Sequence, residues 1–522
     1  MLTKSLRFAP LALALTAIGC AAHVDDAAPE SADDGDELTS NTARSRSLAF
    51  DGAVYVRVDA SDAEILQAVQ RQTKTAFGAL RTAQIGVNNR ELKAVDPKTF
   101  VKSVVEVVTT PGTPGTAMTK VTYRYTDDAV VPVSMARRTA ISLAVLGQGY
   151  ESKTDRILVE CTDNDEEAHD FRGSLWYVFN ASTSACKKAI SAESKVVEAD
   201  RAKLVDPKTQ VPASEVSRLY RPMTVRLGAD KTNKGRSYPE YDRLYAGGVQ
   251  KGKLVMGVVN GVIDHGGGAL VDDSGYHDWM NTMREVFRAR PGYKLVKSEP
   301  QETFTFKVGQ KTLSPTIQQM VDWELDGAWP AGLSQTDRAS LRKQVGDKLI
   351  KHWLTIEAET TVQIGDAPAQ PLTLQLFTYF GAESSEVPHK RAIKNSDVFV
   401  YNGHSYIGFG PLDPSRFSVG DFPDSYQLLF IDGCVSYNYY EKDYFPLKAG
   451  GTKNLDLVTN GMEAPAWQSG WALGRFLARL TDGTQASYRD LLQAASATDP
   501  LRVVDGEVDN AYSPTKTPIK LK

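Results

Sequence analysis

The sequence predicts an α/β protein, in which a mostly parallel central sheet flanked by helices follows a separate mixed α/β domain. From about residue 248 onward, apolar runs of strand length alternate with helical stripes, a pattern typical of parallel sheets. Two runs, DVFVYNG at 397–403 and YQLLFID at 426–432, are almost entirely apolar, as expected of strands buried on both faces. A polar, glycine-rich stretch at 225–247 indicates the boundary between the two domains.

Length and composition narrow the class of protein. The chain has 522 residues, 42% of them hydrophobic and 24% charged, which is typical of a soluble globular protein with more than one domain. The net charge is −4, and no basic stripe with interleaved aromatic residues is present. We therefore exclude nucleic acid as a partner.

The N-terminus carries an export signal. Lys4 and Arg7 precede the apolar run LALALTAIG, which is too short to span a bilayer but suits a signal peptide. The run ends in small residues before Cys20 and resembles the lipobox of bacterial lipoproteins, with Ala17 where Leu is preferred. We expect a signal peptide at 1–20, lipidation of Cys20, and a place in the bacterial cell envelope, as an outer-membrane lipoprotein or secreted. An ordinary secretory signal is the alternative.

Residues 21–47 are rich in Ala, Asp, Glu and Ser and nearly devoid of large apolar side chains. Such a segment cannot bury enough surface to offset the loss of chain entropy on folding. We expect a disordered acidic tether that separates the folded part from the membrane anchor.

The cysteines have separate predicted roles. Lipidation consumes Cys20, and Cys161 and Cys186 lie close in sequence, so in an oxidising compartment we expect them to form a disulfide. Cys434 is then left unpaired. A free thiol in an exported protein is either buried and inert or reactive, and composition alone favours a buried, inert thiol.

The first domain, 48–240, is predicted to begin with a strand at 54–58. Ser61 and Glu64 form a capping box that opens a helix. The runs SVVEVV (103–108) and KVTYRY (120–125) flank PGTPGT, which indicates a hairpin. RILVEC (156–161) and SLWYVF (174–179) are predicted as two further strands.

The second domain, 241–522, is predicted to open with a strand at 254–259 and a helix over 279–287, followed by a strand at 293–296, a βαβ unit. Further helices are expected at 341–353 and 473–480, and a strand at 372–380. Ser487 with Asp490 caps the last helix. No cluster of residues has zinc-ligand spacing, and we expect neither a metal nor a cofactor.

The tripeptide Gly403-His404-Ser405 suggests the nucleophile elbow of lipases, but the chain departs from it. The elbow requires glycine two residues after the serine, and Ile407 stands there. In that fold the catalytic histidine follows the serine, whereas His404 is the last histidine of the chain. The lipase interpretation is therefore excluded.

His404 instead follows one buried strand and Cys434 follows the next, 30 residues later. Because functional groups gather beyond the carboxyl ends of parallel strands, the two side chains should emerge at the same edge of the sheet. An imidazole that accepts the thiol proton would make Cys434 a nucleophile near neutral pH.

An apolar strand that ends in His, followed by one that ends in a small residue and Cys, resembles the layout of the caspase-like (clan CD) cysteine peptidases, nearest to the gingipain-like branch. The resemblance implies a caspase-like fold for the second domain and a hydrolase of the thiol protease class, which cleaves peptide or protein substrates. It further implies that Cys434 is the nucleophile and His404 the general base and acid. The backbone N–H groups of Ser405 and Cys434 would form the oxyanion hole.

The chain departs from the family pattern at two places. Ser405 stands where the family has glycine after the histidine, and Gly433 stands where alanine often precedes the cysteine. The alternative is therefore a catalytically inactive surface or binding lipoprotein with the same fold. His265, in DHGGG, is a second His-Gly, but it precedes Cys434 by 169 residues and is interpreted as part of a glycine-rich loop.

Overall fold

In the computed structural model, the structure describes residues 37–264, 268–381 and 385–522. The predicted signal peptide, Cys20 and most of the predicted tether lie outside the described residues, as does His265. Among the described helices, none has the length and apolar character needed to cross a bilayer. Asp36–Lys522 forms one compact unit.

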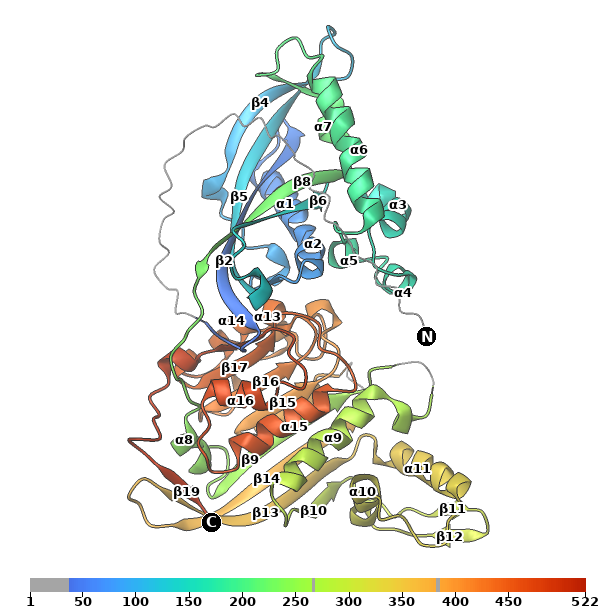
Figure 1. Cartoon of the computed structure of the whole chain (residues 1–522), viewed down its shortest axis with the longest axis vertical. Coiled ribbons are helices and arrows are strands. Elements are labelled where there is room, and N and C mark those ends of the chain that lie inside the picture. Colours follow the sequence, from blue (N-terminus) through green and yellow to red (C-terminus); the bar gives the residue numbers. More distant parts are fainter. Residues whose placement is uncertain (1–36, 265–267, 382–384) are drawn as a thin grey trace, which may run out of the picture. The chain divides into compact units, whose positions relative to one another are not determined.

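The described chain builds two large sheets (Figure 1). The first has the order β6-β8-β2-β5-β4-β7, and β3 pairs with β5. Its strands are β2 (Ala43–Arg57), β3 (Gly86–Val87), β4 (Val101–Val108), β5 (Thr116–Pro132), β6 (Ala140–Leu146), β7 (Gln210–Pro212) and β8 (Tyr220–Asp230). Its helices are α1 (Asp62–Lys74), α2 (Ala76–Thr82), α3 (Thr154–Glu160), α4 (Asp165–Asp170), α5 (Leu175–Val178), α6 (Ser184–Arg201) and α7 (Ala213–Ser217).

The second sheet has the order β1-β18-β17-β16-β15-β9-β14-β13-β10, and β19 pairs with β13. Its strands are β1 (Leu38–Thr39), β9 (Lys253–Gly261), β10 (Lys294–Glu299), β13 (Trp353–Ile364), β14 (Gln370–Gly381), β15 (Val398–Asn402), β16 (Gln427–Asp432), β17 (Leu455–Asn460), β18 (Arg502–Asp505) and β19 (Ile519–Leu521). Five neighbouring strands are parallel to one another: β17, β16, β15, β9 and β14. Antiparallel strands flank them on both sides. The predicted α/β class is confirmed, with a mixed sheet.

The remaining elements surround this sheet. They are the hairpin of β11 (Phe306–Val308) and β12 (Lys311–Leu313), and the helices α8 (Tyr241–Tyr245), α9 (Ser274–Ala289), α10 (Ile317–Asp326), α11 (Gln335–Leu349), α12 (Val387–Lys394), α13 (Ser436–Tyr439), α14 (Glu441–Tyr444), α15 (Ser469–Leu480) and α16 (Tyr488–Ala494). The chain passes from the first sheet to the second between β8 and β9, within the region where the sequence places its boundary. That each half folds as a separate domain stays a prediction.

Side-chain alternation along the central strands divides the core into two clusters. Met256, Val258 and Val400 pack with α9 and α15 on one face of the second sheet (Figure 1). Val255 and Phe399 point to the other face and join the cluster that also contains the core of the first sheet. Because both faces are covered, β15 and β16 are buried along their whole length, as their apolar runs predict.

The predicted end of the tether is the first of four sequence-based predictions that are wrong. The tether does not extend to residue 47, because β1 occupies Leu38–Thr39 and β2 begins at Ala43. The polar composition there is accommodated by Arg46, whose buried guanidinium donates to the carbonyls of Gly228 and Ala136, so the strand keeps a polar side chain without losing its pairing. The first sheet therefore begins before residue 48.

The runs at 156–161 and 174–179 are not strands but lie on α3 and α5. Apolar runs this short do not distinguish a strand from a buried helix segment. The predicted βαβ unit is also wrong, since the strand after α9 is β10, which pairs antiparallel with β13 at the edge of the sheet. The hairpin of β4 and β5 and the capping boxes at Ser61 and Ser487 are confirmed.

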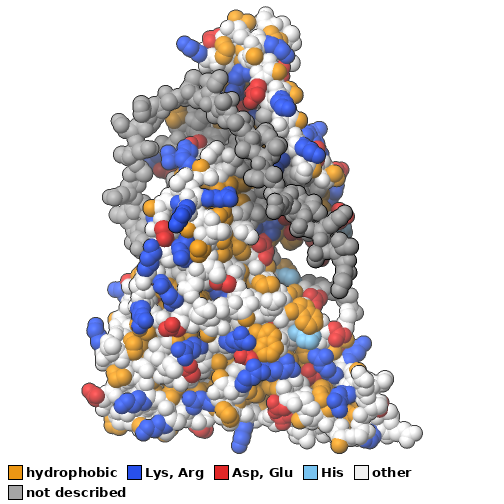
Figure 2. Space-filling model, viewed as in Figure 1, with side chains coloured by type: hydrophobic (Ala, Val, Ile, Leu, Met, Phe, Trp, Pro, Cys, Tyr) orange, Lys and Arg blue, Asp and Glu red, His pale blue; other side chains and the backbone are white. Residues whose placement is uncertain are grey.

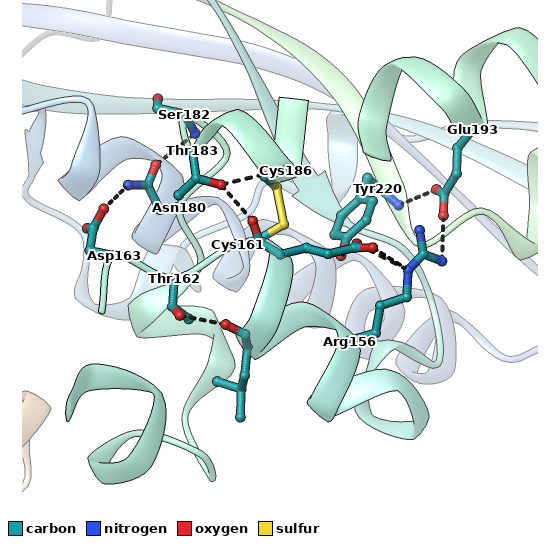
Figure 3. Close-up of a disulfide and its surroundings, with 12 residues drawn as sticks. Arg156, Cys161, Thr162, Asp163, Asn180, Ser182, Thr183, Cys186, Glu193 and Tyr220 are labelled. Carbon is teal, nitrogen blue, oxygen red and sulfur yellow. Dashed lines mark hydrogen bonds and ion pairs between the residues drawn. A yellow bond between two sulfur atoms is a disulfide. The ribbon is translucent and has the colours of Figure 1, made fainter. Parts of the chain in front are cut away.

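Cys161 and Cys186 are joined by a disulfide (Figure 3). Cys161 follows α3 and Cys186 lies in the first turn of α6, so the bond ties these two helices together. Thr183 supports the junction: its hydroxyl donates to the Glu160 carbonyl at 2.6 Å and accepts from the Cys186 N–H at 3.1 Å.

Candidate active site

His404 and Cys434 emerge from neighbouring strands at the same edge of the second sheet. β15 and β16 pair in parallel with Asn402 opposite Asp432, and each functional residue follows its strand by two positions. The two loops touch: a Cβ added at Gly433 would lie 3.5 Å from the Gly403 carbonyl oxygen. The predicted adjacency of the two strand ends is confirmed.

The His404 ring is held in one tautomer by its surroundings. Its Nε2 lies 2.8 Å from the carbonyl oxygen of Ile263, just after β9, the strand on the other side of β15. A carbonyl can only accept, so Nε2 carries a proton, and in the neutral imidazole Nδ1 is the basic nitrogen. The Tyr401 hydroxyl donates to the His404 carbonyl at 2.8 Å, which fixes the backbone below the ring. This arrangement suits a general base that acts through Nδ1.

Cys434 is a free, half-buried cysteine. Burial, with a smaller contribution from the nearby Glu463 carboxylate, raises the pKa of its thiol to about 11, while the backbone N–H of Ala464 and the Arg81 guanidinium oppose the increase. The sulfur is therefore protonated at neutral pH in this conformation. Free cysteine titrates at about 8.5 by comparison.

This pKa predicts an unusual pH dependence of thiol alkylation. Only the thiolate reacts, so the rate of iodoacetamide labelling at Cys434 should still rise about tenfold per pH unit up to about pH 10. The urea-unfolded chain should instead level off above about pH 9. Peptide mass mapping assigns the label to Cys434. A native profile that levels off with the unfolded one would contradict the raised pKa.

Two backbone donors are available at the site. Within the described part of the chain, no acceptor takes a hydrogen bond from the backbone N–H of Ser405 or of Cys434. Ser405 is itself buried, so a hydrogen-bonding partner for its N–H is expected from a bound group or water. Both N–H groups lie where the family resemblance implies an oxyanion hole.

Backbone strain is concentrated in the loops at this edge. Tyr406 and Ile407 follow His404-Ser405 with φ of 49° each, and Val435 follows Cys434 with φ of 50°. A β-branched residue such as valine rarely adopts this left-handed conformation. Such strain persists only where the surrounding structure imposes it, and it gathers at functional sites.

A row of polar side chains crosses the sheet below the site, and sequence reasoning missed it. It consists of the aligned strand-end residues Asn260, Asn402, Asp432, Asn460 and Arg502, all buried. Asp432 accepts from the Asn460 amide at 2.8 Å and pairs with Arg502 at 3.5 Å. The signal was present: four strands end in Asn-Gly or Asp-Gly, at 260–261, 402–403, 432–433 and 460–461.

The aromatic residues after Cys434 do not line an open groove. Tyr437, Tyr439, Tyr440 and Tyr444 are all buried, and Tyr440 donates from its hydroxyl to the Ser405 carbonyl at 3.2 Å. The exposed aromatic side chains near the site are instead Tyr406, Phe409 and Trp467. The Trp467 indole stacks on the His277 ring at 4.0 Å, and Figure 2 shows pale-blue histidine side chains among apolar ones on the visible face.

Two of the other described histidines, His389 and His352, are buried in the protein. His389 is buried, its Nδ1 lies 2.9 Å from the Ser385 carbonyl, and burial lowers its pKa to about 4. His352 is buried between Glu302 and Phe304. No cluster of described residues has the composition of a metal site. An open hollow of about 700 Å³ lined by Glu151 to Arg156 contains neither His404 nor Cys434.

Comparison of the chain with protein-family models, with curated proteins and with solved structures finds no match.

Proposed function

We propose that this protein is a caspase-like cysteine endopeptidase, with Cys434 as nucleophile and His404 as general base and acid. The observation that carries the proposal is the pairing of β15 with β16, which brings the His404 imidazole and the free Cys434 thiol to one edge of a parallel sheet. The crevice beyond parallel strand ends is where α/β proteins bind their ligands.

The proposed reaction has two steps. His404 Nδ1 takes the proton of the Cys434 thiol as sulfur bonds to the carbonyl carbon of the peptide, and the oxyanion receives hydrogen bonds from the N–H groups of Ser405 and Cys434. The imidazolium then gives its proton to the leaving amine and the C–N bond breaks. His404 next deprotonates a water that attacks the thioester, which releases the acid and regenerates the thiol.

Export is part of the proposal. The lipobox-like sequence at Cys20 and the disulfide between Cys161 and Cys186 support a place in the bacterial cell envelope, as an outer-membrane lipoprotein or in secreted form. Disulfides persist in oxidising compartments and are rare in the cytosol. The membrane contact would be the lipid anchor.

One observation favours a second candidate, a catalytically inactive binding lipoprotein with the same fold. A thiol whose pKa is about 11 is a poor nucleophile at neutral pH. If the resting conformation is the only one, the site binds peptides without cleaving them.

The deciding experiment compares two histidine variants. The full chain, reduced at the free thiol, is offered a peptide library and a peptidyl acyloxymethyl ketone, and the labelled residue is mapped by mass spectrometry. We expect cleavage and labelling at Cys434, both reduced about a hundredfold or more in His404→Ala. His169→Ala, on exposed α4, should retain both. Equal labelling of Cys434 in the two variants would favour the binding protein.

A further inference from the structure

A segment of the first half of the chain lies against both loops of the candidate site. This cover segment, residues 76–92, comprises α2, β3 and the 3₁₀ helix η1 (Arg90–Leu92). β3 pairs with β5 of the first sheet, yet the Phe77 ring stacks on Tyr439 of α13 at 6.2 Å. A Cβ added at Gly86 would lie 2.5 Å from the Gly461 carbonyl, so the two backbones approach closely.

Arg81 binds the cover segment to residues near the Cys434 thiol. Its guanidinium pairs with Glu463, the carboxylate that acts on the Cys434 pKa, and it lies 3.4 Å from Glu167. The Arg81 side chain is only 8% exposed, and its Nε donates to the carbonyl of Tyr177 at 3.2 Å. Tyr177 is itself buried and lies near enough to interact electrostatically with Cys434, so this ion pair and the tyrosine lie beside the sulfur.

Arg90 binds the other end of the cover segment to the loop that follows His404. It donates to the Gly408 carbonyl at 2.6 Å and pairs with Asp413 at 3.2 Å. Next to it, the buried Asn438 amide of α13 donates to the carbonyl of Val87 at 3.0 Å. The cover segment is thus tied to the loop after β15 and to the helix after Cys434.

The cover segment is held in a strained conformation. Gln84, Glu91 and Leu92 have φ of 61°, 52° and 53°. Residues persist in this conformation only where surrounding contacts impose it. At Glu91 one such contact comes from the candidate site, because the Glu91 N–H donates to the side-chain oxygen of Asn438 at 3.2 Å.

We propose that the cover segment is an autoinhibitory element, which closes over Cys434 in the resting chain and is released when the Arg81–Glu463 and Arg90–Asp413 ion pairs break. The raised pKa of the thiol agrees with this closed state. The inference rests on the proposed peptidase function for what the closure suppresses. Exposure of the thiol can be measured whether or not the protein is a peptidase.

The test measures alkylation of Cys434 at pH 7.5 and peptide cleavage by the full chain in Arg81→Gln, in Arg90→Gln and in the double variant. Arg71→Gln, on the exposed face of α1, is the matched control. Alkylation in Arg81→Gln discriminates between two effects. Loss of the Arg81 charge without opening would make the thiolate less stable and slow the reaction, whereas release of the cover segment would speed it.

We expect alkylation about tenfold faster in the single variants and faster still in the double variant, with Arg71→Gln unchanged. Unchanged or slower alkylation in both single variants would overturn the proposal. If the double variant does not fold, the single variants decide. Faster alkylation without cleavage of any peptide would support the autoinhibitory role of the cover segment and contradict the proposed peptidase function. Cleavage without faster alkylation would support the peptidase function and contradict the autoinhibitory role.

Discussion

Replacement of Cys434 by alanine should abolish peptide hydrolysis while leaving the fold intact. The thiol is the only proposed nucleophile, and removal of a catalytic nucleophile costs on the order of 10³-fold or more in kcat/KM. The side chain is small and makes no disulfide, so the melting temperature should change little. Cys434→Ser, which keeps the volume but replaces the thiol with a weaker nucleophile, should also be inactive. Initial rates on the best peptide substrate measure the effect.

Cys20→Ser is the matched cysteine control, because it removes a thiol that the proposed chemistry does not use. In soluble recombinant protein it should cleave at the rate of the unaltered chain. Hydrolysis by purified Cys434→Ala within about threefold of that rate would show that another group carries the reaction. Circular dichroism of each variant excludes unfolding as the cause of lost activity.

Replacement of Arg502 by methionine should destabilise the protein more than any surface substitution. Arg502 and Asp432 are 1% and 0% exposed, and the guanidinium also donates to the carbonyl of Ala495 at 2.8 Å. Without it, the Asp432 carboxylate is buried and, among the described residues, keeps only its hydrogen bond from Asn460. Breaking a buried pair from one side costs about 3–5 kcal/mol in the free energy of unfolding. Urea denaturation followed by tryptophan fluorescence measures the loss.

Two companion variants make the measurement specific. Arg479→Met breaks an exposed pair with Asp482, which is worth less than about 1 kcal/mol. The double variant Asp432→Asn with Arg502→Met removes both charges and should recover part of the lost stability, because no uncompensated carboxylate remains. Equal losses in the free energy of unfolding for Arg502→Met and Arg479→Met would show that the buried ion pair contributes no more to stability than the exposed one.

The central part of the sheet was predictable because each of its strands has a signal in its own stretch of sequence. Runs as apolar as those of β15 and β16 have few alternatives to a strand covered on both faces, and the residues that follow them must share an edge. The edges were not predictable from the same signals. The run at 293–296 forms a strand, but its antiparallel partner β13 begins some 60 residues later, and no local pattern selects that partner.

The candidate site was predictable only in its two main residues. His404 and Cys434 follow recognisable strands, whereas Arg81 reaches Glu463 across 382 positions and is visible only once the chain is folded. The Ile263 carbonyl is a backbone group and has no sequence signature. The polar row of strand-end residues did have one, in the repeated Asn-Gly and Asp-Gly pairs. In the sequence, Asn-Gly and Asp-Gly pairs indicate turns. The pattern therefore did not reveal that these Asn and Asp side chains are buried in one row across the sheet.

The short strand β1 determines how the two halves of the chain are connected. Leu38 and Thr39 pair with Val504 and Val503 of β18, and the Ser40 N–H donates to the Arg502 carbonyl at 2.9 Å. The described part of the chain thus begins on the second sheet at β1, forms the whole of the first sheet, and then returns to the second. A single proteolytic nick between β8 and β9 would leave the halves held by this ladder, so full separation requires a second cut or the peeling of β1. The ladder also joins residues more than 460 positions apart, and it can form only after almost the entire chain has been synthesised.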